Sequence, residues 1–265
     1  MRPCGRALGV LCYSLMPLSV SIVCKNSEST IGRTLESVAG LATEIVAVDS
    51  GSTDGTLALL ERHKARIIRS PWLGYVKTKQ LALDSCSQPW VLCLDSDESP
   101  EPDLAAAIRK AVESGTAGGY RINRKVYYRN KPLNHAWQPE WRLRLVRKDR
   151  AFWTGLDPHD RLELREGSTE NLAGSLRHDS ISTFTEFMAK QARHAQTMAS
   201  SMHAEGQRGS VWKLVTSPPS AFLKQLVLKQ AWRDGWPGWL AAASVGASAA
   251  MKYMALIEMS HPDET

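Results

Sequence analysis

The chain has 265 residues, with 33 Lys or Arg against 27 Asp or Glu and a formal net charge of +6. With 43% apolar and 23% charged residues, it has the composition of a globular protein, which excludes a collagenous, mucin-like or largely disordered chain. The length suits one large domain or a main domain with an appendage. A pI near 9.1 indicates an anionic partner: nucleic acid, a phosphorylated small molecule or an acidic membrane surface.

Five cysteines are spread along the chain, at Cys4, Cys12, Cys24, Cys86 and Cys93. Their number is odd and no C-x-x-C pair occurs, so the sequence predicts neither a disulfide framework nor a zinc site. Two of them, Cys24 and Cys93, fall in apolar runs that are typical of core strands. We therefore expect the protein to work in a reducing, cytoplasmic compartment.

An uncharged stretch over residues 7–24 follows two arginines and has the length of a signal peptide or a short anchor. Pro17 interrupts it, and no A-x-A cleavage pattern follows. Residues 18–24 are better explained as a buried strand. We therefore interpret residues 1–16 as an N-terminal extension and place the first element of the fold after it.

From residue 18 to residue 113, apolar runs alternate with segments of helical periodicity. The expected strands are 18–24, 44–50, 65–70 and 90–97, and the expected helices lie over 31–42, 54–61, 81–86 and 102–113. Such an alternation predicts an α/β fold with a mostly parallel sheet and helices on both of its faces. Ligands of these sheets bind beyond the carboxyl ends of the strands.

The middle of the chain, over residues 119–165, shows strand-like alternation in GYRINRKVYYRN, WRLRLVRK and RLELR. Residues 121–165 contain twelve Lys or Arg and five Asp or Glu. This segment therefore accounts for the whole chain's excess of positive charge.

The last third is predicted to be helical. Apolar residues from Phe184 to Met202 fall on one face of a long helix, and a Ser-Pro-Pro run at 217–219 separates it from a second helical region. Residues 207–255 contain six basic residues, one acidic residue and four of the nine tryptophans. The uncharged stretch 235–251 is too weakly apolar to be predicted as a membrane span.

The sharpest chemical feature is the run Asp95-Ser96-Asp97-Glu98 at the end of an apolar strand. Side chains at i and i+2 leave a strand on the same face, so Asp95 and Asp97 are expected to converge on one point. Two carboxylates there suit a hard divalent cation such as Mg²⁺ or Mn²⁺. The alternative is a solvated acidic turn that caps the next helix. Asp49 ends the second strand in the same kind of position, which favours a ligand site.

These motifs resemble, in order and spacing, the nucleotide-sugar domain of family 2 glycosyltransferases, which has the GT-A (Rossmann-like) fold. The motifs are SVSIVCKNSESTIGRTLES, EIVAVDSGSTDGT, SPWLGYVKTKQLAL and WVLCLDSDE. Further on, PEWRLRLVRK, GLDPHDRLEL and the Trp-rich basic tail are similar to the branch that modifies the lipopolysaccharide inner core, including β-1,4-glucosyltransferases acting on heptose. The resemblance covers residues 18–257.

The resemblance implies roles in binding the donor. Asp49 would contact the base or ribose of the sugar nucleotide, with help from the segment around Lys25 and Asn26. Lys79 matches a lysine that the family places near the donor. The expected donor is a sugar nucleotide such as UDP-glucose.

The same resemblance places Asp95 beside the ribose and the metal, and Asp97 on the metal that bridges the diphosphate. Breaking the bond between sugar and diphosphate leaves negative charge on the diphosphate, which a divalent cation and nearby basic side chains stabilise. Direct displacement then inverts the anomeric centre. We therefore expect Mg²⁺ or Mn²⁺ as the cofactor.

The acceptor hydroxyl must lose a proton, so a carboxylate on the opposite side of the sugar is expected to act as general base. Glu140 matches an acidic position of the family, and His159-Asp160 falls where the family has His-Glu. Asp160 is shorter than Glu, which affects its reach. Both carboxylates are candidates, and the structural alternatives are a surface Glu140 and an Asp160 paired with Arg142 or Arg161.

Other residue types that could bind a ligand are expected to be structural. The remaining histidines share no ligand spacing and are interpreted as surface or packing residues: His63, His135, His178, His194 and His203. Trp137 and Trp141 could stack on a sugar ring, although aromatic residues next to a sheet more often belong to the core.

Together these observations predict an inverting, metal-dependent transferase that moves a hexose from a nucleotide sugar to a lipopolysaccharide core or related glycolipid. The predicted organisation is a GT-A domain over 17–180, divided into a nucleotide-sugar half (17–118) and an acceptor and catalytic half (119–180). Residues 181–265 form a helical appendage. One rival is a non-catalytic protein of the same fold. Another is a nucleic-acid binder, which no nucleic-acid motif supports.

The basic, Trp-rich tail has two interpretations. Its lysines and arginines, interleaved with Trp and Phe, fit an amphipathic surface that lies on an anionic bilayer. The alternative is a helical cap packed on the sheet with a solvated basic face. Because a lipid-linked acceptor explains the first, we favour a peripheral location on the cytoplasmic face of the inner membrane.

Overall fold

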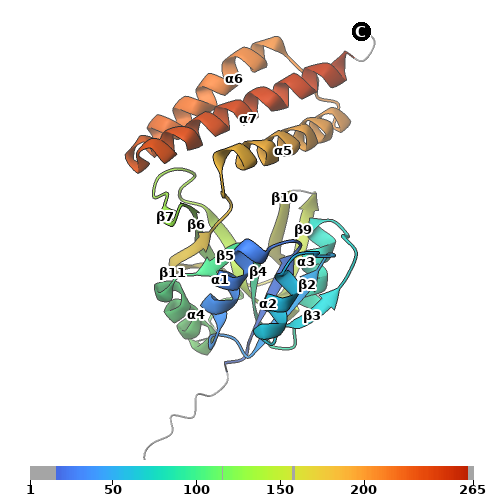
Figure 1. Ribbon diagram of the computed structural model, residues 1–265, viewed down its shortest axis with the longest axis vertical. Coiled ribbons are helices and arrows are strands. Elements are labelled where there is room, and N and C mark those ends of the chain that lie inside the picture. Colours follow the sequence, from blue (N-terminus) through green and yellow to red (C-terminus); the bar gives the residue numbers. More distant parts are fainter. Residues whose placement is uncertain (1–15, 115, 157–158, 262–265) are drawn as a thin grey trace, which may run out of the picture.

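The computed structural model describes residues 16–114, 116–156 and 159–261. Of the expected N-terminal extension over 1–16, only Met16 falls inside the described residues. Figure 1 shows a lower part built around a sheet and an upper part of long helices. The expected α/β class is confirmed, together with a helical C-terminal part.

The first half of the chain forms the parallel strands that its apolar runs predicted. Neighbouring strands follow the order β3-β2-β1-β4, and each pair is parallel. The strands are β1 (Leu18–Cys24), β2 (Glu44–Asp49), β3 (Arg66–Arg69) and β4 (Trp90–Asp95), and the helices between them are α1 (Glu28–Val38), α2 (Thr56–Arg62) and α3 (Tyr75–Asp84). Every residue of β1 is buried or nearly so, as its continuous apolar run requires.

Beyond β4 the sheet continues in the order β8-β6-β11-β5, with β7 paired to β6. These elements are β5 (Glu98–Pro100), α4 (Pro102–Ser114), β6 (Gly119–Tyr128), β7 (Lys131–Pro132), β8 (Trp141–Arg147) and β11 (Thr169–His178). The pairs β4–β8 and β8–β6 are antiparallel. The sheet is therefore mixed: the expected parallel pairing holds for its first four strands and for β6 with β11, and the other pairs are antiparallel. The connection from β6 to β8 contains no crossover helix, which suits their antiparallel pairing.

Apolar side chains cover both faces of the sheet. One face packs against α1 and α4 through Ile31, Leu35 and Ile108, all fully buried. The other face packs against α3 and against a separate antiparallel pair, β9 (Ala151–Leu156) and β10 (His159–Leu164), which contribute Trp153 and Leu162. The sheet thus forms a layer between these two sets of elements.

The upper part consists of α5 (Phe184–Ala204), α6 (Val211–Leu223) and α7 (Trp236–Ser260), which pack along one another. The expected break at 217–219 is wrong, because Pro218 and Pro219 lie inside α6 and the chain turns at residues 205–210 instead. Close packing outweighs the poor helix propensity of proline here. A Cβ atom added to Gly246 of α7 would lie 3.1 Å from the carbonyl oxygen of Pro218.

By length and composition alone, helix α7 could cross a membrane. Residues 235–251 were expected from the sequence to be too weakly apolar for a membrane span. Its best window has a mean hydropathy of 1.4, and 33% of that window is buried inside the protein. No second helix of the described residues meets the same criteria.

The appendage is joined to the sheet domain by a buried carboxylate. Asp234, on a short 3₁₀ turn (Ala231–Asp234), accepts hydrogen bonds from the backbone N–H groups of Asn134, His135 and Ala136 at 2.8–3.0 Å. Tyr128 at the end of β6 packs edge-on against aromatic rings of α5 and α7. These contacts hold the helices above the strand ends.

Candidate active site

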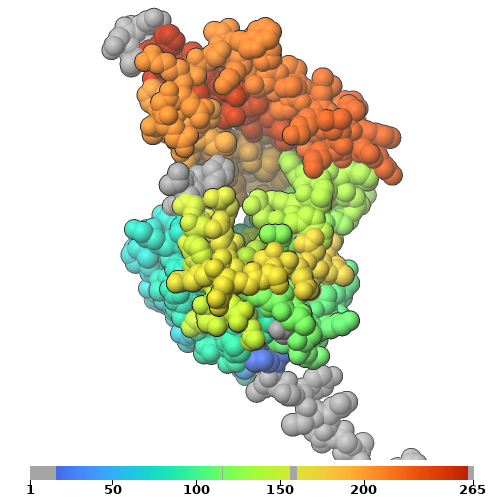
Figure 2. Space-filling model, turned by 180° about the vertical axis from the view of Figure 1, so that it is seen from behind, coloured from blue at the N-terminus to red at the C-terminus, as the bar shows by residue number. Residues whose placement is uncertain are grey.

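A cavity of about 1720 Å³ lies between the carboxyl ends of the strands and helix α5. Its lining includes Lys25 after β1, Asp95 and Asp97 after β4, Asp160 on β10 and Lys190 on α5. Figure 2 shows a hollow beneath the helices, between the strands coloured green and yellow. The cavity occupies the edge at which the sheet was expected to bind a ligand.

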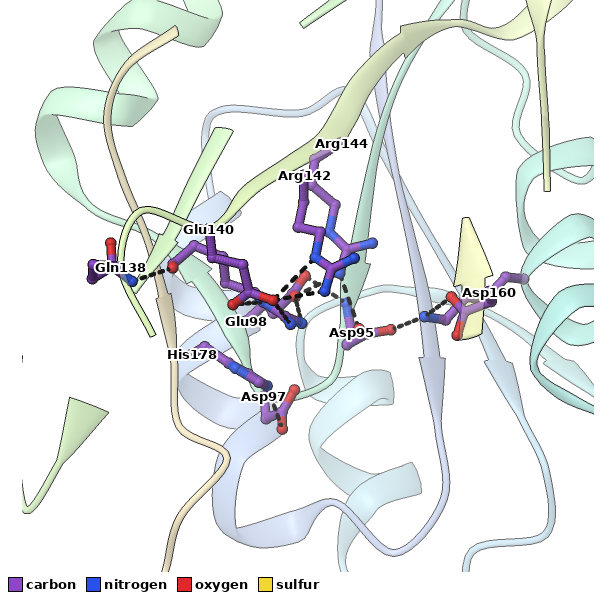
Figure 3. A network of polar contacts seen from close by, with 11 residues as sticks. Asp95, Asp97, Glu98, Gln138, Glu140, Arg142, Arg144, Asp160 and His178 are labelled. Atoms are coloured by element: carbon purple, nitrogen blue, oxygen red, sulfur yellow. Dashed lines mark hydrogen bonds and ion pairs between the residues drawn. The ribbon is translucent and has the colours of Figure 1, made fainter. Parts of the chain in front are cut away.

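Asp95 lies between two buried cations at the end of β4 (Figure 3). Its Oδ1 is 2.7 Å from Nζ of Lys79, and its Oδ2 is 3.1 Å from Nη2 of Arg144. Burial alone would raise the pKa of Asp95, but the charges of Lys79 and Arg144 outweigh it and hold that pKa well below its usual range. Asp95 is therefore an anion that positions Lys79 and Arg144 at the carboxyl end of β4.

Asp97 faces away from this pair, toward His178 at the end of β11. Oδ2 of Asp97 is 3.4 Å from Nε2 of His178. The expected convergence of Asp95 and Asp97 is found only in part: both line the same cavity, but they contact different partners, because β4 ends at Asp95 and the chain turns at Ser96 and Asp97. Ser96 anchors that turn, since its Oγ lies 2.8 Å from Oγ of Ser27. Burial opposes ionisation of Asp97, yet His178 outweighs it and lowers the pKa of Asp97.

Glu140 is held between two guanidinium groups. Arg124 donates to both of its carboxylate oxygens, at 2.6 and 3.1 Å, and Nη2 of Arg142 donates at 2.7 Å. Burial would raise the pKa of Glu140, but these hydrogen bonds and charges lower it to about 2. Arg124 and Arg144 also share the fully buried carboxylate of Glu98, at 3.0 and 2.6 Å.

Asp160 lies on the other side of the cavity and shares Lys79 with Asp95. The distance from Nζ of Lys79 to Oδ2 of Asp160 is 2.8 Å. Burial lowers the pKa of Lys79, but Asp95 and Asp160 together outweigh it and raise that pKa, so Lys79 stays protonated. Among the described residues, Asp160 therefore pairs with Lys79 and not with Arg142 or Arg161, the partners named as alternatives from the sequence.

The segment expected to hold the nucleotide is shaped by hydrogen bonds that two side chains accept from the backbone. Lys25 lines the cavity. Asp49 is 2% exposed, and its carboxylate accepts from the backbone N–H groups of Gly51 and Ser52. Asn26, with φ at 49°, accepts from the N–H of Thr53 at 2.8 Å. In this structure Asp49 and Asn26 shape the loop beside the cavity.

Two histidines, His159 and His178, lie at the ends of β10 and β11. His159 begins β10, but its side chain lies outside what the structure describes. His178, expected to be a surface or packing residue, lines the cavity beside Asp97. Sequence spacing could not reveal this contact, because the antiparallel pairing of β11 with β5, which sets His178 opposite Glu98, brings the two residues together.

Asp97 and His178 are the side chains best suited to hold a divalent cation. The described residues contain no group of three or more His, Cys, Asp or Glu side chains arranged for a metal. A cation that also binds the diphosphate of a sugar nucleotide needs fewer protein ligands, since phosphate oxygens and water supply the rest. A carboxylate and an imidazole 3.4 Å apart fit that requirement.

Comparisons with known proteins agree on one family. The model of the family described as "Glycosyl transferase family 2" matches residues 19–163. The chain is 33% identical over 264 residues to the lipopolysaccharide core biosynthesis glycosyltransferase LpsC of Rhizobium meliloti (strain 1021), covering 93% of each chain. It is 27% identical over 235 residues to the uncharacterized glycosyltransferase RT0209 of Rickettsia typhi, covering 84% of this chain and 80% of that relative.

Among solved structures, S. aureus TarS 1-349 in complex with UDP-GlcNAc is similar at a TM-score of 0.48 and 14% identity, over 92% of this chain and 91% of that chain. The α/β sheet, its carboxylates at the strand ends and the family match together define the protein as a glycosyltransferase with the GT-A fold. The chain belongs to glycosyl transferase family 2. The resemblance seen in the sequence is thereby confirmed.

Proposed function

We propose that this glycosyltransferase moves a hexose, with inversion, from a nucleotide sugar to a glycolipid acceptor of the lipopolysaccharide core. The supporting observation is the presence of Asp95, Asp97 and Asp160 in one cavity at the carboxyl ends of the strands. Family membership supports sugar transfer, and the name of the R. meliloti relative supports a core acceptor. The nucleotide sugar UDP-glucose is the first donor to test.

The cationic side chains supply the donor site. Lys79 and Arg144 lie at the strand end with their charges fixed by Asp95, so they can accept a diphosphate without rearrangement. Asp97 and His178 would hold a Mg²⁺ or Mn²⁺ ion, which neutralises the charge that develops on the leaving diphosphate. Lys25 and the loop bearing Asp49 would surround the nucleoside.

Asp160 is the better candidate for the general base. It lines the same cavity as Asp95 and Asp97, whereas Glu140 lines a neighbouring cavity and is held by two arginines. A carboxylate with a pKa near 2 is a weak proton acceptor at neutral pH. Lys79 would orient Asp160 toward the acceptor hydroxyl.

Replacing Asp97 with asparagine is expected to weaken Mn²⁺-dependent binding of UDP-glucose by about tenfold or more, equivalent to ~1.4 kcal/mol. The neutral amide keeps the shape of the side chain but removes the charge that would hold the cation. Calorimetric titrations with and without Mn²⁺ measure this change. Asp84→Asn, an exposed residue at the end of α3, is the matched control.

If wild type and Asp97→Asn bind UDP-glucose equally with and without Mn²⁺, the proposed metal bridge is wrong. If several sugar nucleotides bind but none is turned over with a core glycolipid, the protein is a non-catalytic member of the fold.

The same proposal includes a peripheral place on the cytoplasmic face of a membrane. Four tryptophans of the appendage are more than half exposed, at 51–75%: Trp212, Trp232, Trp236 and Trp239. Lys213 and Arg233 lie beside two of them in sequence. Exposed indole rings among basic side chains favour an anionic membrane surface. Free, buried Cys24, Cys86 and Cys93 support a reducing compartment.

Co-sedimentation with vesicles that contain anionic lipid is expected at low salt and is expected to fall at least fivefold in Trp212→Ser/Trp232→Ser. The exposed indole rings supply the apolar contact and the basic residues supply the charge. Trp72→Ser, an exposed tryptophan of the sheet domain, is the control and should sediment like wild type. Protein that stays in the supernatant at low salt would contradict membrane association.

A further inference from the structure

A second cavity of about 590 Å³ lies between the sheet domain and the appendage. Arg124, His178, Ser180 and Phe187 line both this cavity and the first. The two cavities therefore adjoin near the pair formed by Asp97 and His178. A ligand in the second cavity would lie next to a donor in the first, as an acceptor must.

The second cavity has an excess of positive charge. Lys224 and Lys229, from a π-helical turn (Lys224–Leu228) and the residue after it, line it together with Arg124. Lys229 donates through Nζ to the backbone carbonyl oxygen of Gln138, a neutral partner, at 2.9 Å. Among the described residues that line this cavity, Glu140 is the one carboxylate, and its oxygens are engaged by arginines. The lysines are thus available for an anion.

A buried side-chain amide in the same turn has a hydrogen-bond donor without a partner in the part of the chain that the structure describes. Gln225 is 7% exposed and lines the cavity, and its Nε2 has no hydrogen-bond partner among the described residues. Buried polar groups are nearly always hydrogen-bonded, so an exception in a cavity indicates a ligand or water. Short π-helical turns are frequent at functional sites. An oxygen of a ligand would satisfy this amide.

The opposite wall is aromatic and held under backbone strain. Trp137 and Phe187 pack edge to face with ring centroids 5.8 Å apart, and both line the cavity. Trp137 has φ of 60°, which is uncommon for a bulky residue. The three backbone hydrogen bonds that Asp234 accepts just before it hold the segment in place. The appendage thereby fixes an aromatic platform beside the candidate active site.

We infer that the second cavity binds an anionic sugar unit of the acceptor, with the ring against Trp137, a sugar oxygen on Gln225 and the anionic group on Lys224 and Lys229. A sugar has an apolar C–H face for the aromatic wall and oxygens for the amide, and a carboxylate or phosphate on it matches the lysines. This inference rests on the proposed transfer to a glycolipid and adds the kind of acceptor residue that is recognised.

The test uses the full chain and three soluble probes: glucose 6-phosphate, glucuronate and glucose. Ligand-observed NMR titrations are run with saturating UDP and Mn²⁺, so that the donor cavity is filled. Glucose 6-phosphate, glucuronate or both should bind at least tenfold more tightly than glucose. Their relative affinities tell phosphate from carboxylate.

Two variants of residues that line the second cavity test whether the probes bind there. Lys224→Gln/Lys229→Gln should weaken the anionic probes about tenfold and leave glucose unchanged, because it removes only charge. Gln225→Leu should weaken all three probes severalfold at similar side-chain volume. Lys213→Gln, which removes an exposed lysine of α6 outside the cavity, is the control and should bind like wild type.

Equal affinity for the anionic probes and glucose would overturn the inference, as would tight anionic binding that survives in the double lysine variant. Inorganic phosphate that binds as tightly as glucose 6-phosphate would overturn the sugar-specific part. UDP binding in the same samples separates the two proposals. Intact UDP binding without anionic sugar binding refutes only the second cavity, and the reverse result refutes only the donor site.

Discussion

Asp160→Asn is expected to lower kcat by about 10²- to 10⁴-fold, the contribution typical of a general base. The substitution keeps the size of the side chain and its place on β10, and it removes the carboxylate that would take the acceptor proton. Lys79 keeps Asp95 as a partner at 2.7 Å, so the donor site should remain intact. UDP release with a core glycolipid as acceptor measures kcat, and UDP-glucose titration checks donor binding.

Glu140→Gln is the matched control for this prediction. Glu140 is held by Arg124 and Arg142 and lines the second cavity, so its loss should change kcat by less than about tenfold. A larger loss in Glu140→Gln than in Asp160→Asn would reverse the assignment of the base.

The pH profile gives an independent check on Glu140. Its pKa is lowered from 4.5 to about 2, so the unfolded chain binds the proton more readily than the folded one. The stability contributed by its ion pairs is therefore present above pH 4.5 and is lost as the pH falls from there toward 2. Glu140 does not titrate between pH 5 and 8, so any activity transition in that range belongs to another group.

Glu98→Gln is expected to lower the free energy of unfolding by about 3–5 kcal/mol, the cost of leaving buried charges without a counter-ion. Glu98 is fully buried, and its Oε1 accepts from both Arg124 and Arg144. Its Oε2 accepts from the backbone N–H of Asp95. Without this carboxylate, the buried guanidinium groups of Arg124 and Arg144 would each lose one of their counter-ions.

Urea unfolding of wild type and Glu98→Gln measures the loss. Glu163→Gln is the control, because Glu163 is 46% exposed and its ion pair with Arg161 spans 3.7 Å. An exposed pair of this kind contributes about 0–1 kcal/mol. A Glu98→Gln protein within about 1 kcal/mol of wild type would show that Asp95 and Glu140 alone compensate the arginines.

Much of the first half of the fold could be read from the chain. The runs that became β1, β2 and β4 are rich in Val, Ile or Leu, which is typical of strands buried on both faces. Helices were expected from apolar spacing in each of these connections and were found, although α3 begins at Tyr75, six residues before the expected helix over 81–86. The helices of the appendage were harder to predict, because Pro218 and Pro219 have a low helix propensity. Packing against α7 stabilises α6 despite these prolines.

The candidate site shows the same division. Asp95 and Asp97 stand out in the sequence because they lie at the end of a recognisable strand, and Lys79 was identified through the family resemblance. The partners Arg144 and His178 do not, since nothing local distinguishes Arg144 from the other basic residues of the middle segment or His178 from the other histidines. Charge counting found the excess of cations there but could not show that some of them are buried against carboxylates of the first half.

The sequence by itself determined the α/β class, the family and the strand end that bears the acidic motif, because apolar periodicity and motif order are local properties of a chain. Only the tertiary structure decided that Asp95 faces two cations while Asp97 faces His178. It also decided that α5 and the π-helical turn close a second cavity beside the first. These contacts join residues far apart in the chain, and their geometry depends on how the sheet and the appendage pack together.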